Sequence, residues 1–341
     1  MVTGHTGFTG AWLLLLASAQ GASVCGLSLP AEAGSLVDMA DLRGQWPELL
    51  ADITEPGVAA AAITAFEPTA VVHLAAQPLV RASYADPLLT FNTNVMGTAR
   101  VLDACVRSTT VRHVLVVTTD KVYGGLDHSH ASTEAFTESD PLGATDPYGA
   151  SKVAAEAAAS AWRQLARNRP TIVTARAGNV IGGGDTAADR LLPDLVRAFR
   201  EGRPAHVRNP MAVRPWQHVL DAVNGYLCLL SALNAGREIP PALNFGPSMA
   251  QPDISVAQVC EVAASRWGDG SVVLDATAEG PPETTVLRID SRLATSELGW
   301  QCRWNGREAV ERTVDWWRSV DSGVSPLTAC ERDIHDFLEK H

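Results

Sequence analysis

The sequence has little that points to a metal, a nucleic acid or a membrane. Its six cysteines are scattered without a CxxC pair, and no histidine–cysteine cluster has metal-site spacing. The formal net charge of −11 lacks the basic excess of a general nucleic-acid-binding protein. No apolar run approaches the roughly 20 residues that cross a bilayer. We therefore expect no metal, no nucleic-acid partner and no membrane span. Scattered cysteines are typical of a reduced, cytoplasmic protein.

One short apolar segment resembles the core of an export signal. Residues 11–17 (AWLLLLA) are followed by small residues that resemble a cleavage site. However, no positive charge precedes the run, and a glycine-rich turn comes directly before it. We therefore interpret the segment as the first helix of a folded domain.

Short β-branched runs alternate with amphipathic stretches over the first half of the chain. The expected strands are 1–3, 23–29, 70–74, 111–118 and 171–177. The expected helices are 11–20, 59–65, 93–107 and 148–167. This alternation predicts an α/β protein, with a Rossmann-type doubly wound parallel sheet that is covered by helices on both faces.

The pattern changes after about residue 180, where glycine and proline become frequent and strands become isolated. We predict a smaller C-terminal α/β lobe that binds substrate. The expected division is a dinucleotide-binding domain over 1–178, with a returning segment near 212–247, and a lobe formed mainly by 179–341. The first strand has only three residues before its turn, which is short for a strand and points to missing residues or a misassigned start.

A glycine-rich turn, TGHTGFTG, lies between the first expected strand and helix. Gly4 permits a tight turn, Gly7 lets the backbone approach a pyrophosphate, and Gly10 lets the helix pack against the strand. The helix N-terminus then offers free N–H groups and a positive dipole end to phosphates. Thr6 and Phe8 of the same turn are predicted to contact the dinucleotide.

The end of the second expected strand leaves the choice between NAD and NADP open. An acidic residue normally ends this strand and binds the ribose hydroxyls, but Ser28 stands there. Ser28 can still bond a hydroxyl, and no arginine follows before Arg43 to favour a 2′-phosphate. Asp52 and Ile53 are predicted at the adenine, although a simple loop aspartate is an equally good interpretation. We expect NAD, with NADP as the alternative.

Tyr148 and Lys152 stand four residues apart at the start of an expected helix, so their side chains share one face. A neighbouring ammonium favours the phenolate and lowers the pKa of the phenol. Tyr148 is therefore a candidate general base for a substrate hydroxyl. The alternative is an aromatic core residue followed by a surface lysine.

A polar cluster, Thr118-Thr119-Asp120-Lys121, ends the buried strand at 111–118. In doubly wound folds, ligands bind beyond the carboxyl ends of the strands. Thr119 can bond a reacting hydroxyl, and Asp120 with Lys121 forms a candidate acid/base pair. The alternative is a strand-end turn with solvated charges.

Together these motifs resemble the extended short-chain dehydrogenase/reductase family. The segments TGHTGFTG, HLAAQ, TTDKVYG, YGASK and RAGNVIG occur in the order typical of that family, over nearly the whole chain. Within the family, the CDP-glucose 4,6-dehydratases are most similar in HLAAQPLVRASY, TNVMGT, RAGNVIGGGD with DRLLPD, and RNPMAVRPWQHV. The resemblance implies a bound NAD and a nucleotide-sugar substrate, with a CDP-hexose favoured.

The resemblance also implies a reaction. Tyr148, helped by Lys152 and Thr119, removes the C4 hydroxyl proton while the C4 hydride goes to NAD. Asp120 as acid and Lys121 as base then eliminate water across C5–C6, and the hydride returns to C6. The product is a 4-keto-6-deoxy sugar. Epimerases of this family generally lack such a pair, so Asp120-Lys121 favours dehydration.

Binding residues follow from the same resemblance. At the cofactor these are Leu74, Ala75, Ala76, Gln77, Asn94 and Thr118, with Asn94 in a supporting position. At the nucleotide sugar these are Arg81, Ser83, Asn179, Arg190, Leu192, Pro193, Arg208, Asn209, Arg214 and Trp216. Arginine suits a diphosphate because its planar fork makes paired, charge-assisted bonds. For each arginine the alternative is an ion pair, and for Trp216 it is a core aromatic. His73 and His218 are expected to be packed histidines rather than catalysts.

Residues 88–106 and 148–165 are rich in apolar residues and alanine. The resemblance implies that they form a four-helix homodimer interface, whereas the alternative is packing within one chain. Two other functions stay open. One is a nucleotide-sugar 4-epimerase or reductase that uses the same tyrosine and lysine. The other is a non-catalytic dinucleotide-binding protein, which would have no need of Tyr148, Lys152 and Thr119.

Overall fold

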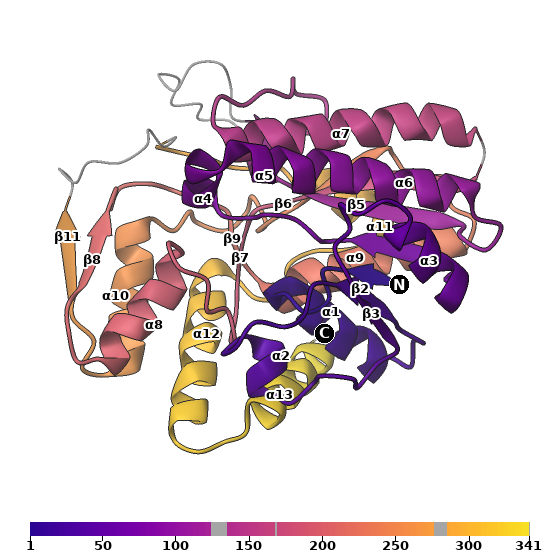
Figure 1. Cartoon of the computed structure of the whole chain (residues 1–341). Helices are drawn as coiled ribbons and strands as arrows, with labels where there is room; N and C mark the ends of the chain where they lie inside the picture. Colours follow the sequence, from indigo (N-terminus) through magenta and orange to yellow (C-terminus); the bar gives the residue numbers. More distant parts are fainter. Residues whose placement is uncertain (124–134, 168, 276–284, 341) are drawn as a thin grey trace.

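A parallel sheet of seven strands forms the centre of the protein (Figure 1). The computed structural model describes residues 1–123, 135–167, 169–275 and 285–340. The strand order is β10-β6-β5-β4-β1-β2-β3, which runs outward from β1 in both directions. This is the order of a Rossmann-type sheet, so the predicted fold class is confirmed. The strands are β1 (Val2–Thr3), β2 (Gly26–Ser28), β3 (Glu48–Leu50), β4 (Ala70–His73), β5 (His113–Thr119), β6 (Thr171–Ala177) and β10 (Ala242–Phe245).

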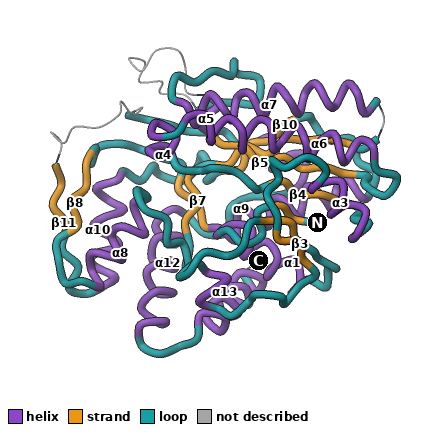
Figure 2. Tube along the Cα trace, viewed as in Figure 1, coloured by secondary structure: helices purple, strands orange, loops and turns teal. Residues whose placement is uncertain are grey.

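Helices cover both faces of this sheet (Figures 1 and 2). The upper face in Figure 1 carries α3 (Val58–Phe66), α6 (Thr98–Arg107) and α7 (Pro147–Ala166). The opposite face carries α1 (Phe8–Ala19) and α9 (Val219–Asn234), which pack against each other. Shorter helices are α2 (Leu36–Met39), α4 (Val80–Ala85), α5 (Pro87–Phe91), the π-helix η1 (Asn92–Gly97) and the 3-10 helix η2 (Asp120–Tyr123).

The apolar run at 11–17 lies inside α1 and is buried throughout. Its leucines pack in the core beneath the sheet, and the indole nitrogen of Trp12 donates to the carbonyl of Gly183 at 2.9 Å. The interpretation of this segment as a core helix is confirmed. No helix among the residues described is long and apolar enough to cross a membrane.

The second half of the chain adds a smaller lobe with its own apolar core. Its helices α8 (Leu191–Arg200), α10 (Val256–Trp267) and α12 (Gly306–Asp321) bury side chains such as Leu195, Val259 and Val310 against one another. Two small parallel pairs complete it: β8 (Ala205–Arg208) with β11 (Val272–Asp275), and β7 (Asn179–Ile181) with β9 (Trp216–His218).

The two halves are more interleaved than a division at residue 178 suggests. Strand β10 returns to the main sheet beside β6. Near the end of the chain, α11 (Arg292–Leu298) and α13 (Pro326–Glu339) lie on either side of the lobe helix α12 in sequence. Ala294, Trp304 and Phe337 nevertheless pack into the core around α1. The predicted returning segment near 212–247 includes β10, whereas the return of α11 and α13 to the first core was not predicted.

Two buried carboxyl groups make the stability of this packing depend on pH. Asp221 on α9 accepts the backbone N–H groups of Arg303 at 2.6 Å and Trp304 at 3.4 Å. Asp333 on α13 has one carboxyl oxygen, Oδ2, without a hydrogen-bond partner. Burial raises the pKa of each group from 3.8 to about 7. Each carboxyl therefore takes up a proton on folding between these values, so the free energy of unfolding falls as the pH rises through this window.

We expect Asp333→Asn to weaken this pH dependence, because the amide has no proton to lose. The thermal midpoint of the variant should rise relative to wild type as the pH increases from about 5 to about 8. Circular dichroism melts at the two pH values measure the difference. Glu331→Gln, at an exposed position of the same helix, is the control. If the thermal midpoints of wild type and variant differ by the same amount at both pH values, Asp333 does not titrate as a buried carboxyl.

Candidate active site

The glycine-rich turn joins β1 to α1 and leaves no room for a side chain at Gly4 or Gly10. Gly4 has a φ of +74°, and a Cβ there would lie 2.7 Å from the backbone nitrogen of Ala75. A Cβ at Gly10 would lie 2.2 Å from the carbonyl oxygen of Gly4. The α1 N-terminus has no side-chain cap and no acidic residue in its first turn. Its N–H groups and positive dipole end therefore suit the pyrophosphate of a dinucleotide, as the sequence predicted.

We expect Gly10→Ala to open this turn, because the atoms that the new methyl meets are backbone atoms. The substitution should weaken NAD binding about tenfold or more and cost on the order of 1–3 kcal/mol of stability. Calorimetric titration with NAD and a thermal melt measure both effects. Gly143→Ala is the matched control, because nothing lies within 4 Å of its Cβ position. Unchanged NAD affinity in Gly10→Ala would place the dinucleotide elsewhere.

The predicted adenosine-side residues lie beyond the ends of β2 and β3. The hydroxyls of Thr6 and Ser28 bond each other at 2.6 Å, so the turn and the end of β2 meet. Asp52 instead caps its own turn, with Oδ1 accepting from the backbone and hydroxyl of Thr54 at 2.8 Å. Ile53 is buried in the core. The structure therefore favours the loop interpretation of Asp52.

The segment Leu74–Gln77 continues from the carboxyl end of β4 and is held by Asn94. The Oδ1 atom of Asn94 accepts from the backbone of Gln77 at 2.8 Å, and its amide donates to the hydroxyl of Ser151 at 2.9 Å. Asn94 thus ties this segment to α7. The expected helix at 93–107 is confirmed as helical, but its first residues form the π-helix η1, and α6 begins at Thr98.

The five predicted catalytic residues meet at the carboxyl end of β5. Thr119 ends the strand, and Asp120 and Lys121 begin η2. Tyr148 and Lys152 lie in the first turns of α7, both with 8% of their surface exposed. Thr119 is hydrogen-bonded to the phenol of Tyr148, and Nζ of Lys152 donates to the carbonyl of Val117 at 3.2 Å. The threonine, acid/base pair and tyrosine–lysine pair therefore form one site.

Burial dominates the electrostatics of the tyrosine–lysine pair. It raises the pKa of Tyr148 to about 12, against the hydrogen bond with Thr119 and the charge of Arg190. It also lowers the pKa of Lys152 to about 8, against the charge of Glu156. The predicted lowering of the Tyr148 pKa was wrong, because it considered the charge of Lys152 and not the burial of the phenol.

Asp120 is buried, and its Oδ2 atom has no hydrogen-bond partner among the described groups. Burial raises the pKa of this carboxyl, while Lys121, Thr119 and Arg214 oppose the shift. The other oxygen, Oδ1, accepts from the hydroxyl of Thr119 at 3.0 Å. A buried carboxyl with a raised pKa and one free oxygen is suited to donate a proton to a leaving group. The position therefore supports the predicted role of Asp120 as an acid.

Two of the four predicted arginines form ion pairs within the described part of the chain. Arg190 bonds Asp185 at 2.9 Å, and Arg81 on α4 bonds Asp189 at 2.8 Å. The positive charge of Arg214 lowers the pKa of Asp120, against the effect of burial. Arg208 ends β8, next to Asn209.

Other predicted substrate residues contribute to packing. Leu192 and Trp216 lie in the apolar core of the lobe with Pro193 buried beside Leu192, so the structure supports the core interpretation of Trp216. The hydroxyl of the buried Ser83 donates to the carbonyl of Val80 at 2.6 Å. Asn179 begins β7.

Both histidines are packed, as expected. His73 lies between the hydroxyls of Thr3 at 2.7 Å and Thr98 at 2.9 Å. His218 lies edge-on to Trp12 and Trp304. Burial lowers the pKa of each imidazole to about 3, so both are neutral at physiological pH.

Sequence reasoning missed Glu156, which is buried with Arg176 in an ion pair of 3.0 Å. The sequence spacing could have indicated Glu156, because Tyr148, Lys152 and Glu156 follow one another at intervals of four residues and therefore share one face of α7.

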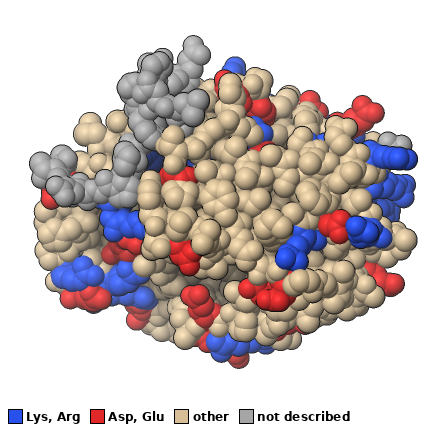
Figure 3. Space-filling model, turned by 45° about the horizontal axis from the view of Figure 1, so that its top comes forward, with Lys and Arg blue, Asp and Glu red and all other residues tan. Residues whose placement is uncertain are grey.

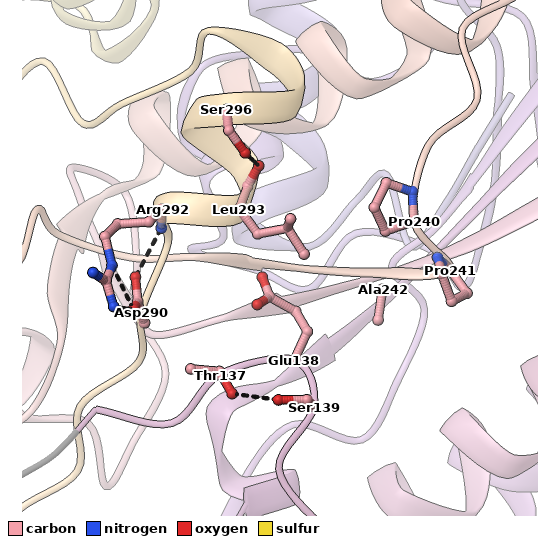
Figure 4. A pocket seen from close by; sticks show the side chains of 10 residues that line it. All are labelled: Thr137, Glu138, Ser139, Pro240, Pro241, Ala242, Asp290, Arg292, Leu293 and Ser296. Atoms are coloured by element: carbon pink, nitrogen blue, oxygen red, sulfur yellow. Dashed lines mark hydrogen bonds and ion pairs between the residues drawn. The ribbon is translucent and has the colours of Figure 1, made fainter.

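An open pocket of about 640 Å³ lies at the amino end of β10 (Figure 4). Glu138 and Leu293 face each other across it, and Arg292 bonds Asp290 at its rim. None of its lining residues is a predicted site residue. Within the described ranges no group of three or more His, Cys, Asp or Glu side chains could hold a metal ion.

Comparison with known proteins decides the family. Residues 1–246 match the model of the NAD dependent epimerase/dehydratase family. The chain belongs to this family. The resemblance that the motifs indicated is therefore confirmed at the level of the whole chain.

The relatives of this epimerase/dehydratase family member include sugar-nucleotide dehydratases. A CDP-glucose 4,6-dehydratase of Salmonella typhimurium is 36% identical, over 99% of this chain and 95% of the relative. DesIV, a dTDP-glucose 4,6-dehydratase from Streptomyces venezuelae with NAD and TYD bound, has a TM-score of 0.80 at 26% identity, covering 96% of this chain and 98% of its own. MoeE5 in complex with UDP-glucose and NAD has a TM-score of 0.79 at 26% identity, covering 94% and 99%.

Proposed function

We propose that this protein is an NAD-dependent nucleotide-sugar 4,6-dehydratase that acts on CDP-glucose. The single observation that carries the proposal is the buried Asp120, whose Oδ2 atom has no hydrogen-bond partner among the described groups, next to Lys121 and to the threonine bonded to Tyr148. An enzyme that only moves a hydride at C4 needs the tyrosine and lysine. The additional acid/base pair is needed to remove water. The likeness to a CDP-glucose 4,6-dehydratase over 99% of the chain supports the choice of nucleotide.

The first step requires a base at the C4 hydroxyl. Tyr148 takes this proton, Thr119 orients the phenol, and the ammonium of Lys152 stabilises the phenolate that acts. When bound, NAD would supply the hydride chemistry of the reaction, and its oxidised nicotinamide would carry a positive charge. That positive charge would oppose the burial that raises the pKa of Tyr148. Gly4, Gly7 and Gly10 would hold its pyrophosphate and Leu74–Gln77 would line it.

The second step removes water from the resulting 4-keto sugar. The ketone makes the C5 proton acidic, and Lys121 takes it. Asp120 gives its proton to the C6 hydroxyl, which leaves as water and creates the C5–C6 double bond. After hydride adds at C6, a proton returns to C5 and the product is the 4-keto-6-deoxy sugar. Arg190 and Arg214 are proposed to bind the diphosphate by exchanging their present partners for its oxygens.

Incubation of the purified protein with CDP-glucose tests the proposal. We expect a product with the alkali-dependent absorbance of a 4-keto sugar, and faster turnover than with the dTDP, UDP or GDP sugar. A product with C4 inverted and no water lost would instead identify a 4-epimerase. Tightly bound NAD with no turnover of any of the four nucleotide sugars would favour a binding protein.

We also propose that the protein is a cytoplasmic homodimer formed through residues 88–106 and 148–165. Large apolar side chains gather on α4, α5 and η1, where Leu88 is 82% exposed. Leu89, Tyr84 and Met96 are exposed nearby. Figure 3 shows a broad surface with few charges on the side that carries α5 and α6. The six cysteines are free, which agrees with a reducing compartment.

Leu88→Glu should convert the dimer to a monomer, because it places a charge in the centre of this apolar surface. The leucine is exposed, so the fold should survive. Sedimentation measures the mass of the particle. Leu274→Glu on β11, at another exposed leucine, is the control. An unchanged dimer in Leu88→Glu would place the interface elsewhere.

A further inference from the structure

The buried carboxylate of Glu156 lies one helical turn beyond Lys152 on α7 and is held by four hydrogen bonds. Oε1 accepts from the hydroxyl of Thr118 at 2.6 Å and from Nε of Arg176 at 3.0 Å. Oε2 accepts from the hydroxyl of Thr174 at 2.8 Å and from Nη2 of Arg176 at 3.1 Å. With 6% of its side chain exposed, Glu156 is a charge fixed in place.

This carboxylate and the lysine ammonium hold neighbouring residues of β5. Nζ of Lys152 donates to the carbonyl of Val117, while Glu156 holds the side chain of Thr118. The strand then ends at Thr119, which is bonded to Tyr148. One face of α7 is thus attached to the last three residues of the strand. On this face the carboxylate of Glu156 follows the ammonium of Lys152 by one helical turn.

Arg176 extends the attachment to the acid/base pair. Its Nη1 donates to the phenol of Tyr123 at 2.7 Å, and that phenol donates to Oδ1 of Asn244 at 2.8 Å. Tyr123 ends η2, which begins with Asp120 and Lys121. The guanidinium therefore joins α7 to the element that carries the proposed acid and base.

We infer that Glu156 is a positioning residue that keeps Lys152 in its ammonium form and fixes α7 against β5 and η2 for proton transfer. The inference rests on the proposed function for its effect on catalysis, but its effect on Lys152 does not. The groups around Lys152 are Tyr148 and Glu156 on α7, the neutral His73 on β4, and Arg176 on β6 behind Glu156. Among them, Glu156 is the negative charge that opposes the desolvation of the ammonium.

The titration of Lys152 can be measured directly, because the sequence contains only three lysines: Lys121, Lys152 and Lys340. We would label the ε-carbon of lysine with ¹³C and follow the three resonances against pH, with Lys152→Met to assign the signal. In the wild type the Lys152 resonance should titrate with a pKa of about 8. In Glu156→Gln the pKa should fall by about one further unit. When kcat is plotted against pH, its alkaline limb should also shift to lower pH, and KM for CDP-glucose should stay unchanged.

Thr174→Val is the matched control, because it removes one hydrogen bond from the carboxylate and leaves its charge. A purely structural role predicts that both variants lower the melting temperature and leave the Lys152 titration in place. Glu156→Gln leaves a buried guanidinium unpaired, so the double variant Glu156→Gln/Arg176→Met, which removes both charges, is measured in parallel. A Lys152 pKa that stays at the wild-type value in the folded variant would overturn the inference. Because the NMR titration needs no turnover, inactivity of the wild type toward CDP-glucose would contradict only the proposed function.

Discussion

Tyr148→Phe should reduce the turnover of CDP-glucose by about 10²–10⁴-fold, the usual contribution of a positioned acid or base. The substitution removes one oxygen atom, and that atom is the one bonded to Thr119. The ring stays in its buried position, so the thermal midpoint and the bound NAD should change little. Steady-state kinetics with the 4-keto assay measure the loss.

Tyr84→Phe is the matched control, because Tyr84 is 45% exposed on α4. It should retain wild-type kcat. A Tyr148→Phe variant that turns over at the wild-type rate would remove the phenol from the reaction. A variant that loses NAD as well as activity would indicate that the hydroxyl serves binding rather than proton transfer.

Asp120→Asn should separate oxidation from dehydration. The amide fits the same site but cannot give a proton to the C6 hydroxyl, so elimination of water should slow by about 10²–10⁴-fold. In the proposed mechanism the C4 proton goes to Tyr148 and not to this carboxyl. On mixing with CDP-glucose, the variant should therefore accumulate enzyme-bound NADH and the 4-keto hexose, and release little 4-keto-6-deoxy sugar.

Rapid-mixing absorbance of NADH, with mass spectrometry of the sugar, measures both halves of this result. Asp315→Asn, at a partly exposed aspartate on α12 paired with Arg266, is the control and should behave as the wild type. Normal release of the deoxy sugar by Asp120→Asn would assign the acid to another group. Absence of both NADH and product would show that Asp120 acts already in the first step.

The sequence predicted those features that depend on local spacing. The glycine turn, the alternation of strands and helices, and the four-residue step from Tyr148 to Lys152 are all short-range patterns. The polar cluster after β5 was predicted because its place at a strand end determines where it lies in a parallel sheet.

Features that depend on burial or on distant contacts could not be predicted from those patterns. The pKa of Tyr148 is raised because neighbouring elements bury the phenol. The π-helix η1 has no sequence period of its own, so residues 93–107 were interpreted as one helix. Arg176 binds Glu156 across 20 positions of the chain, and Trp304 joins a core that begins at β1. Such contacts exist only once the chain has folded.

The most direct measurement follows the hydrogen at C4 of the sugar. The protein is incubated with CDP-glucose that carries deuterium at C4, and the product is examined by NMR spectroscopy and mass spectrometry. Removal of the C4 hydride, loss of water and return of the hydride to C6 predict one deuterium in the C6 methyl group. Deuterium that remains at C4 of an intact or inverted hexose would contradict the account.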